Sequence, residues 1–132
     1  DSMQAAVLLE KLTIFDEELE MRNKVNDYYR KYLNNAQYIP KNYHSAHALF
    51  SVTLGSHDKR DQMIYRLNEN NIPTVVYYKY PIHLMKGFAY LEYDKGDFPV
   101  SEKLSNTIVS LPMHPYLNHD DIDLIIKTLK DK

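Results

Sequence analysis

The sequence predicts an α+β domain in which helices cover one face of a small, mostly antiparallel sheet. Apolar residues recur at helical spacing in segments such as 15–33 and 118–129. Short runs rich in β-branched residues, at 49–54, 72–76 and 108–111, are typical of strands and alternate with the helical segments. Helices and strands in this mixed order indicate the α+β class.

The composition is that of one globular domain. A chain of 132 residues, 44% hydrophobic and 26% charged, is long enough to bury a core. Its formal net charge of -2 argues against a nucleic-acid partner, and its apolar runs are far shorter than the ~20 residues of a membrane helix, so no membrane partner is expected. The absence of cysteine excludes disulfides and a thiolate nucleophile. Because nothing demands an oxidising compartment, we expect a cytoplasmic protein.

The first quarter of the chain predicts two helices. Residues 2–12 are rich in strong helix formers, and no cap precedes the pattern, which indicates a fragment of a longer protein. Thr13 is the expected cap of a second helix that runs to Leu33. Asn34 and Asn35 end it.

The middle of the chain predicts one strand and one helix. Residues 36–46 carry no regular pattern, whereas residues 49–54 alternate as in a strand. Asp58 is the expected N-cap of a helix over 58–70. Asn71 suits the left-handed residue that closes such a helix, because a short amide side chain tolerates positive φ.

The stretch from residue 71 to residue 83 gathers directional hydrogen-bonding groups. A predicted strand over 72–76 leads into a loop stiffened by proline. This loop carries three phenols, an ammonium and an imidazole: Tyr77, Tyr78, Lys79, Tyr80 and His83. Strand alternation would place the side chains of Tyr77 and Tyr78 on opposite faces. We expect the functional site here, with the rest of the chain as its scaffold.

The last third predicts three helices and one strand. Residues 84–93 are expected to form a short aromatic helix, and Pro99 suits the first position of the next helix. Residues 108–111 read as a strand. Asn118 or Asp120 is expected to cap the final helix.

Two other groups of residues are weaker candidates for a binding site. His44, His47 and His57 could be imagined as metal ligands, but no clear acidic partner or rigid element presents all three, so we expect no metal. Residues 28–32 interleave aromatic and basic side chains, as in platforms that stack nucleic-acid bases. A helix would spread these side chains over several faces, which argues against such a platform. Three isolated glycines exclude a glycine-rich phosphate loop in this chain.

Four segments carry a more specific signal. They are DSMQAAVLLEKL at 1–12, NIPTVVYYKYPIH at 71–83, FPVSE at 98–102 and SLPMHPYL at 110–117. In this order and spacing they resemble the C-terminal domain of DegT/DnrJ/EryC1/StrS aminotransferases, which are pyridoxal-phosphate enzymes acting on nucleotide sugars. The last two segments are most similar to the branch that aminates UDP-linked 3-keto uronic acids. Lys79 and Asn71 depart from the family's usual proline and glycine.

The resemblance implies a fold and a division of labour. Residues 1–132 would be the single small domain of a fold-type I aminotransferase, and the large domain with the Schiff-base lysine would be absent from this chain. The chain alone would then be inactive and would not bind pyridoxal 5'-phosphate stably. It would contribute sugar-nucleotide contacts through Tyr77, Tyr78 and His83, together with dimer surface, but no catalytic, cofactor-binding or metal-binding residue.

For the whole enzyme, the resemblance implies a cytoplasmic homodimer that uses glutamate to aminate a UDP-sugar for cell-surface polysaccharide or glycan synthesis. The alternative is a free-standing, non-catalytic interaction module with the same fold. A piece of an enzyme would expose an apolar patch or self-associate, whereas a stand-alone module should be monomeric.

Overall fold

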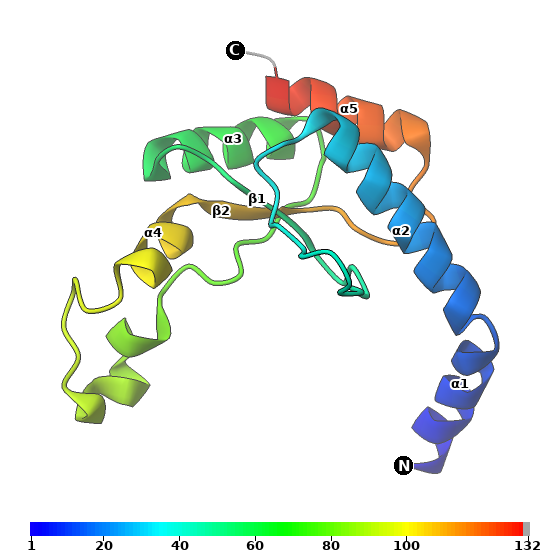
Figure 1. Ribbon diagram of the computed structural model, residues 1–132, viewed down its shortest axis with the longest axis horizontal. Helices are drawn as coiled ribbons and strands as arrows, with labels where there is room; N and C mark the ends of the chain where they lie inside the picture. The colour runs from blue at the N-terminus through cyan, green and yellow to red at the C-terminus, as the bar shows by residue number, and fades with distance from the viewer. Residues whose placement is uncertain (131–132) are drawn as a thin grey trace.

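The computed structural model describes residues 1–130, and their order of helices and strands confirms the α+β class (Figure 1). The elements within these residues are a two-stranded antiparallel sheet, five α-helices and two short 3₁₀ helices. The elements are α1 (Ser2–Thr13), α2 (Phe15–Tyr32), β1 (Phe50–Thr53), α3 (His57–Glu69), η1 (Ile82–Leu84), η2 (Lys86–Leu91), α4 (Pro99–Thr107), β2 (Ile108–Leu111) and α5 (His119–Lys130). No helix of this part of the chain is long and apolar enough to cross a membrane.

The sheet is smaller than the sequence predicted. β1 and β2 pair from Phe50–Leu111 to Thr53–Ile108, as expected for two of the three predicted strands. The third, over 72–76, is wrong: its one sheet contact is the bridge between Val75 and Ser110.

Proline explains why the third strand does not form. Pro73 has no amide hydrogen and therefore cannot donate to a ladder. Val75 donates to the Ser110 carbonyl at 3.2 Å and accepts from its amide at 2.8 Å. This single two-way bridge fixes the entry to the 71–83 stretch against β2.

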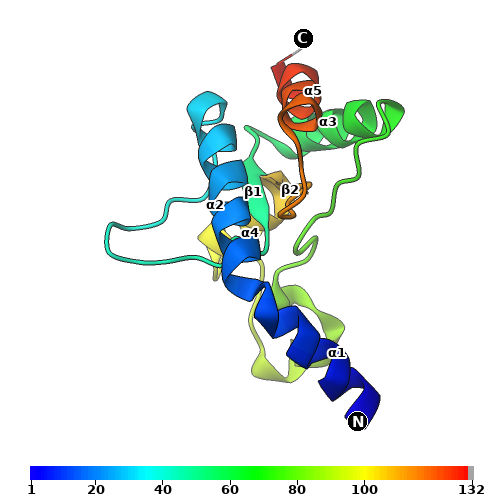
Figure 2. The same cartoon turned by 90° about the vertical axis from the view of Figure 1, so that its right-hand side faces the viewer.

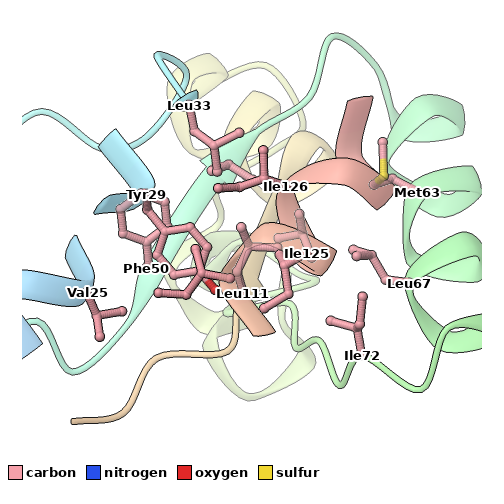
Figure 3. Packing of buried hydrophobic residues seen from close by; sticks show 13 residues of the cluster. Val25, Tyr29, Leu33, Phe50, Met63, Leu67, Ile72, Leu111, Ile125 and Ile126 are labelled. Atoms are coloured by element: carbon pink, nitrogen blue, oxygen red, sulfur yellow. The ribbon is translucent and has the colours of Figure 1, made fainter. Parts of the chain in front are cut away.

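Helices α2, α3 and α5 cover one face of the sheet, as Figures 1 and 2 show from two directions. α3 and α5 pack side by side, and α2 contacts α5. Buried aliphatic and aromatic side chains from these helices meet those of the strands (Figure 3). Tyr29 and Phe50 stack with ring centroids 4.6 Å apart, and the Tyr29 hydroxyl donates to the Pro112 carbonyl at 3.0 Å. Burial of this cluster is the main favourable term for folding.

Three helix ends differ from the prediction. Asp1 caps α1 by accepting from the amide of Gln4, where no cap was expected. Thr13 belongs to α1, because its hydroxyl donates back to the Glu10 carbonyl instead of capping α2. Ser56, not Asp58, caps α3.

Three other ends are confirmed. Asn71 follows α3 with φ of 56°, in the left-handed region. Pro99 occupies the start of α4, where its missing amide hydrogen is harmless. Asn118 accepts from the amide of Asp121 at 2.8 Å and is therefore the cap of α5. The predicted helix over 84–93 is wrong: this part of the chain ends η1 at Leu84 and forms the 3₁₀ helix η2.

Helix α1 has no buried residue and runs away from the rest of the molecule (Figures 1 and 2). Its apolar side chains are exposed, as is that of Phe15 at the start of α2. The α1 residues concerned are Met3, Val7, Leu8, Leu9 and Leu12. We call this set, with Phe15, the α1 apolar surface.

Candidate functional site

The candidate site begins where the chain leaves α3. Ile72 is buried, and its amide donates to the Leu67 carbonyl at 2.8 Å. The bridge from Val75 to Ser110 then holds the chain to β2. The loop that follows therefore starts from two fixed points, one on a helix and one on a strand.

Tyr77 and Tyr78 lie side by side instead of on opposite faces. Their ring centroids are 5.6 Å apart in an edge-to-face arrangement with an angle of 69°. The predicted alternation is wrong because extended pairing ends at Val75 and both tyrosines lie in a turn. Tyr78 is 69% exposed and Tyr77 is 42% exposed, so both present surface to solvent.

These tyrosines line a cavity of about 230 Å³ against α4. Tyr80 also lines this cavity, together with three residues of α4: Ser101, Leu104 and Ser105. We call this the tyrosine cavity. It combines phenol and serine hydroxyls with apolar walls, which is the usual make-up of a small-molecule site. Hydroxyls that both donate and accept suit a polyhydroxylated ligand.

His83 lies apart from the tyrosine cavity and is 9% exposed. Its Nε2 is 3.1 Å from Oε1 of Glu102, and its ring packs on Phe98 with centroids 4.9 Å apart. Because an ionised carboxylate only accepts, Nε2 carries the hydrogen of this bond. The other ring nitrogen, Nδ1, is then the atom left for a ligand.

Glu102 is a residue of this site that sequence reasoning missed. The same Oε1 accepts from the backbone amide of Gly96 at 2.7 Å. The Gly96 amide, and then the hydrogen bond and charge of His83, hold the pKa of Glu102 below its usual value, although desolvation opposes them. The FPVSE segment contains Glu102, but nothing in its spacing indicates a contact with a histidine 19 residues away.

The histidines considered as metal ligands do not form a site. Within residues 1–130 no three His, Cys, Asp or Glu side chains are placed to hold a metal ion. His47 is buried, and desolvation lowers its pKa. His57 instead lies near carboxylates of its own helix, 3.4 Å from Asp61.

Residues 1–130 match a family described as "DegT/DnrJ/EryC1/StrS aminotransferase family". A "UDP-2-acetamido-2-deoxy-3-oxo-D-glucuronate aminotransferase" of Pseudomonas aeruginosa is 35% identical over 98% of this chain and 35% of the relative. A "dTDP-3-amino-3,4,6-trideoxy-alpha-D-glucose transaminase" of Micromonospora megalomicea is 34% identical over 99% of this chain and 37% of the relative. The chain thus spans about a third of the length of these relatives.

Solved structures give the same correspondence. A DegT DnrJ EryC1 StrS aminotransferase from Brucella abortus superposes with a TM-score of 0.86 at 40% identity, over 98% of this chain and 35% of that one. DesV of S. venezuelae, crystallised with a ketimine intermediate, superposes with a TM-score of 0.89 at 25% identity, over 97% of this chain and 35% of that one.

Proposed function

This chain belongs to the DegT/DnrJ/EryC1/StrS aminotransferase family, and from that premise we propose that it forms the C-terminal part of a nucleotide-sugar aminotransferase. The complete enzyme transfers an amino group from glutamate to a keto-sugar nucleotide. The name of the Pseudomonas aeruginosa relative supports a UDP-linked 3-keto uronic acid as the acceptor. The product would serve cell-surface polysaccharide or glycan synthesis, in a cytoplasm that suits a chain without cysteine.

The tyrosine cavity is the observation that carries this proposal. Tyr77 and Tyr78 present two phenols on one side of a loop anchored to α3 and β2. Phenols donate to sugar hydroxyls and carboxylates, and Ser101 and Ser105 of α4 line the same cavity. We assign Tyr77 and Tyr78 to sugar-nucleotide contacts, and His83 to a further contact through Nδ1.

The residues of this chain do not fit the role of holding pyridoxal 5'-phosphate. When bound to an aminotransferase, this cofactor supplies the electron sink for amino-group transfer. A lysine that binds it as a Schiff base needs a desolvated site, but every lysine among residues 1–130 is exposed. We therefore assign cofactor binding to the part of the enzyme outside this chain.

The α1 apolar surface supports a further part of the proposal. Six large apolar side chains are exposed on this one terminal segment, and clusters of exposed apolar side chains often mark sites of protein contact. We assign this surface to contacts with the remainder of the full-length enzyme, which we propose to be a homodimer. A free-standing module of the same fold would need no such contact and should be monomeric.

Borohydride reduction of the native polypeptide that contains this sequence tests the proposal. Reduction in the presence of pyridoxal 5'-phosphate, followed by peptide mapping, should label one lysine outside residues 1–132. This chain alone is the control and should gain no stoichiometric label. A native polypeptide that ends near Asp1 and takes no label would instead favour the interaction module.

A further inference from the structure

A second cavity, of about 370 Å³, lies next to the tyrosine cavity. The two share Tyr80, Pro81 and Ser105 in their linings. The charged and amide side chains of the second cavity are His57, Arg60, Lys79, Lys95, Glu102 and Asn106. We call it the cationic cavity.

Cationic side chains outnumber carboxylates in this lining. Arg60, Lys79 and Lys95 line the cavity with one carboxylate, Glu102, in a chain whose net charge is -2. Asp61, which pairs with Arg60, balances one of the three positive charges. Glu102 is already engaged by Gly96 and His83. Neither lysine forms an ion pair with another residue of the described range 1–130. The Lys79 ammonium lies 6.0 Å from the centroid of the Tyr80 ring, a contact that uses none of its hydrogen-bond capacity for a carboxylate. Both ammonium groups can therefore still donate to an anion.

Arg60 gives the cationic cavity a fixed point. Its side chain is 2% exposed, which is rare for arginine unless the group is bonded. Nε lies 2.7 Å from Asp61, and Nη1 donates to the Ser105 carbonyl at 3.0 Å. Neither bond uses Nη2. A guanidinium held in this way has already lost its rotamer freedom, so binding a ligand orders it at little further entropic cost.

We propose that the cationic cavity binds a diphosphate. Planar guanidinium donors and flexible ammonium groups are the usual protein partners of phosphate oxygens. The Tyr80 hydroxyl adds a neutral donor, and so does the second hydrogen of the Asn106 amide, whose first hydrogen bonds the Glu102 carbonyl. Because both cavities share Tyr80, Pro81 and Ser105, a sugar in the tyrosine cavity would have its diphosphate beside Lys79.

This proposal rests on the proposed function only in the source of the diphosphate, which is either the sugar nucleotide or a free phosphate compound. The binding chemistry itself requires no aminotransferase activity. Failure of the cofactor-labelling experiment would therefore leave the cationic cavity intact as a binding site, and failure to bind a diphosphate would leave the assignment as an aminotransferase intact.

Titration of this chain with inorganic pyrophosphate, followed by NMR, tests the proposal. We expect saturable shifts at the Arg60 Nε–H and at the amides of Ser105 and Asn106. Lys79→Gln and Lys95→Gln should each weaken binding about threefold, as expected for ion pairs of exposed lysines. Lys24→Gln is the control: it removes the same charge from an exposed position on α2 and should change affinity less than twofold.

UDP-glucuronate distinguishes the two sources. If the diphosphate belongs to the sugar nucleotide, UDP-glucuronate should also shift the NMR signals of Tyr78. Tyr78→Phe should then weaken the binding of UDP-glucuronate but not that of pyrophosphate. If the cavity serves a free phosphate compound, only pyrophosphate should bind saturably. Absence of saturable shifts with both probes, or equal weakening by Lys24→Gln and Lys79→Gln, would overturn the proposal.

Discussion

Oε1 of Glu102 lies 3.1 Å from Nε2 of His83, and this contact joins α4 to the end of the tyrosine-bearing loop. The same oxygen accepts the amide hydrogen of Gly96 at 2.7 Å. One carboxylate oxygen thus holds both ends of the segment that contains η1 and η2. This explains how a segment with little regular structure keeps a defined place beside the candidate site.

Glu102 should make stability depend on pH. Its pKa is lowered in the folded state, first by the Gly96 amide and then by His83. A carboxyl whose folded pKa lies below its unfolded value of about 4.5 stabilises the fold fully above that value, and this contribution is lost as the pH falls through the folded pKa. Urea unfolding between about pH 6 and pH 3 should therefore show a shallower pH dependence in Glu102→Gln.

A charge-matched control separates this effect from net charge. Glu10→Gln removes an exposed carboxyl on α1, away from the site. Its unfolding curve should keep the pH dependence of the parent chain. If Glu102→Gln also keeps it, the contact with Gly96 and His83 is not present in solution.

The helix cap at Ser56 gives a second prediction. Its side chain accepts from the Lys59 amide, which is otherwise without an intrahelical partner. Ser56→Ala should lower the free energy of unfolding by about 1 kcal/mol, measured by urea denaturation. Asp58→Asn changes the residue that the sequence indicated as cap and should cost only a few tenths of a kcal/mol. A larger loss at Asp58 than at Ser56 would contradict this assignment.

Ile122 tests the core. It is fully buried on α5, whereas Leu124, two residues later on the same helix, is 46% exposed. Ile122→Ala should lower the free energy of unfolding by about 2–5 kcal/mol, through lost burial and the cavity left behind. Leu124→Ala should stay within about 0.5 kcal/mol. Similar losses at both positions would mean that α5 presents a different face to the sheet.

The α1 apolar surface predicts the behaviour of the chain in solution. Sedimentation equilibrium should give a mass above that of the monomer, because exposed large apolar side chains drive association. The double change Leu8→Glu and Leu12→Glu should restore the monomer, while Leu124→Glu serves as control. A parent chain that is monomeric at all concentrations would favour the free-standing module.

Periodicity was sufficient to predict most of the fold. The five α-helices, the pair of strands at 50–53 and 108–111, and the left-handed Asn71 follow from local patterns, since each depends on neighbours in the chain. The predicted helix over 84–93 is the exception. The predicted strand over 72–76 did not form, because a ladder also needs amide donors that Pro73 lacks. The cap at Ser56 could have been found from its position before α3, where serine and aspartate compete.

Sequence patterns alone could not predict the geometry of the tyrosine cavity. Tyr77, Tyr78 and Tyr80 do line one cavity, yet the wall opposite them comes from α4, which local patterns cannot bring near. Arg60 shows the same limit. An arginine on an amphipathic helix usually faces solvent, but Arg60 is buried and donates to the Ser105 carbonyl. Local patterns could not predict this bond, because Ser105 lies 45 residues away in the sequence.

The most direct measurement compares the two half-reactions of the complete enzyme carrying Tyr78→Phe. Because Tyr78 is assigned to the sugar nucleotide, amination of the keto-sugar should slow by about tenfold, the value of one hydrogen bond. The half-reaction with glutamate should keep its rate, and Tyr65→Phe, an exposed tyrosine on α3, should change neither. Equal loss in both half-reactions would contradict the account, because it would mean that Tyr78 supports the fold or the cofactor instead of the sugar nucleotide.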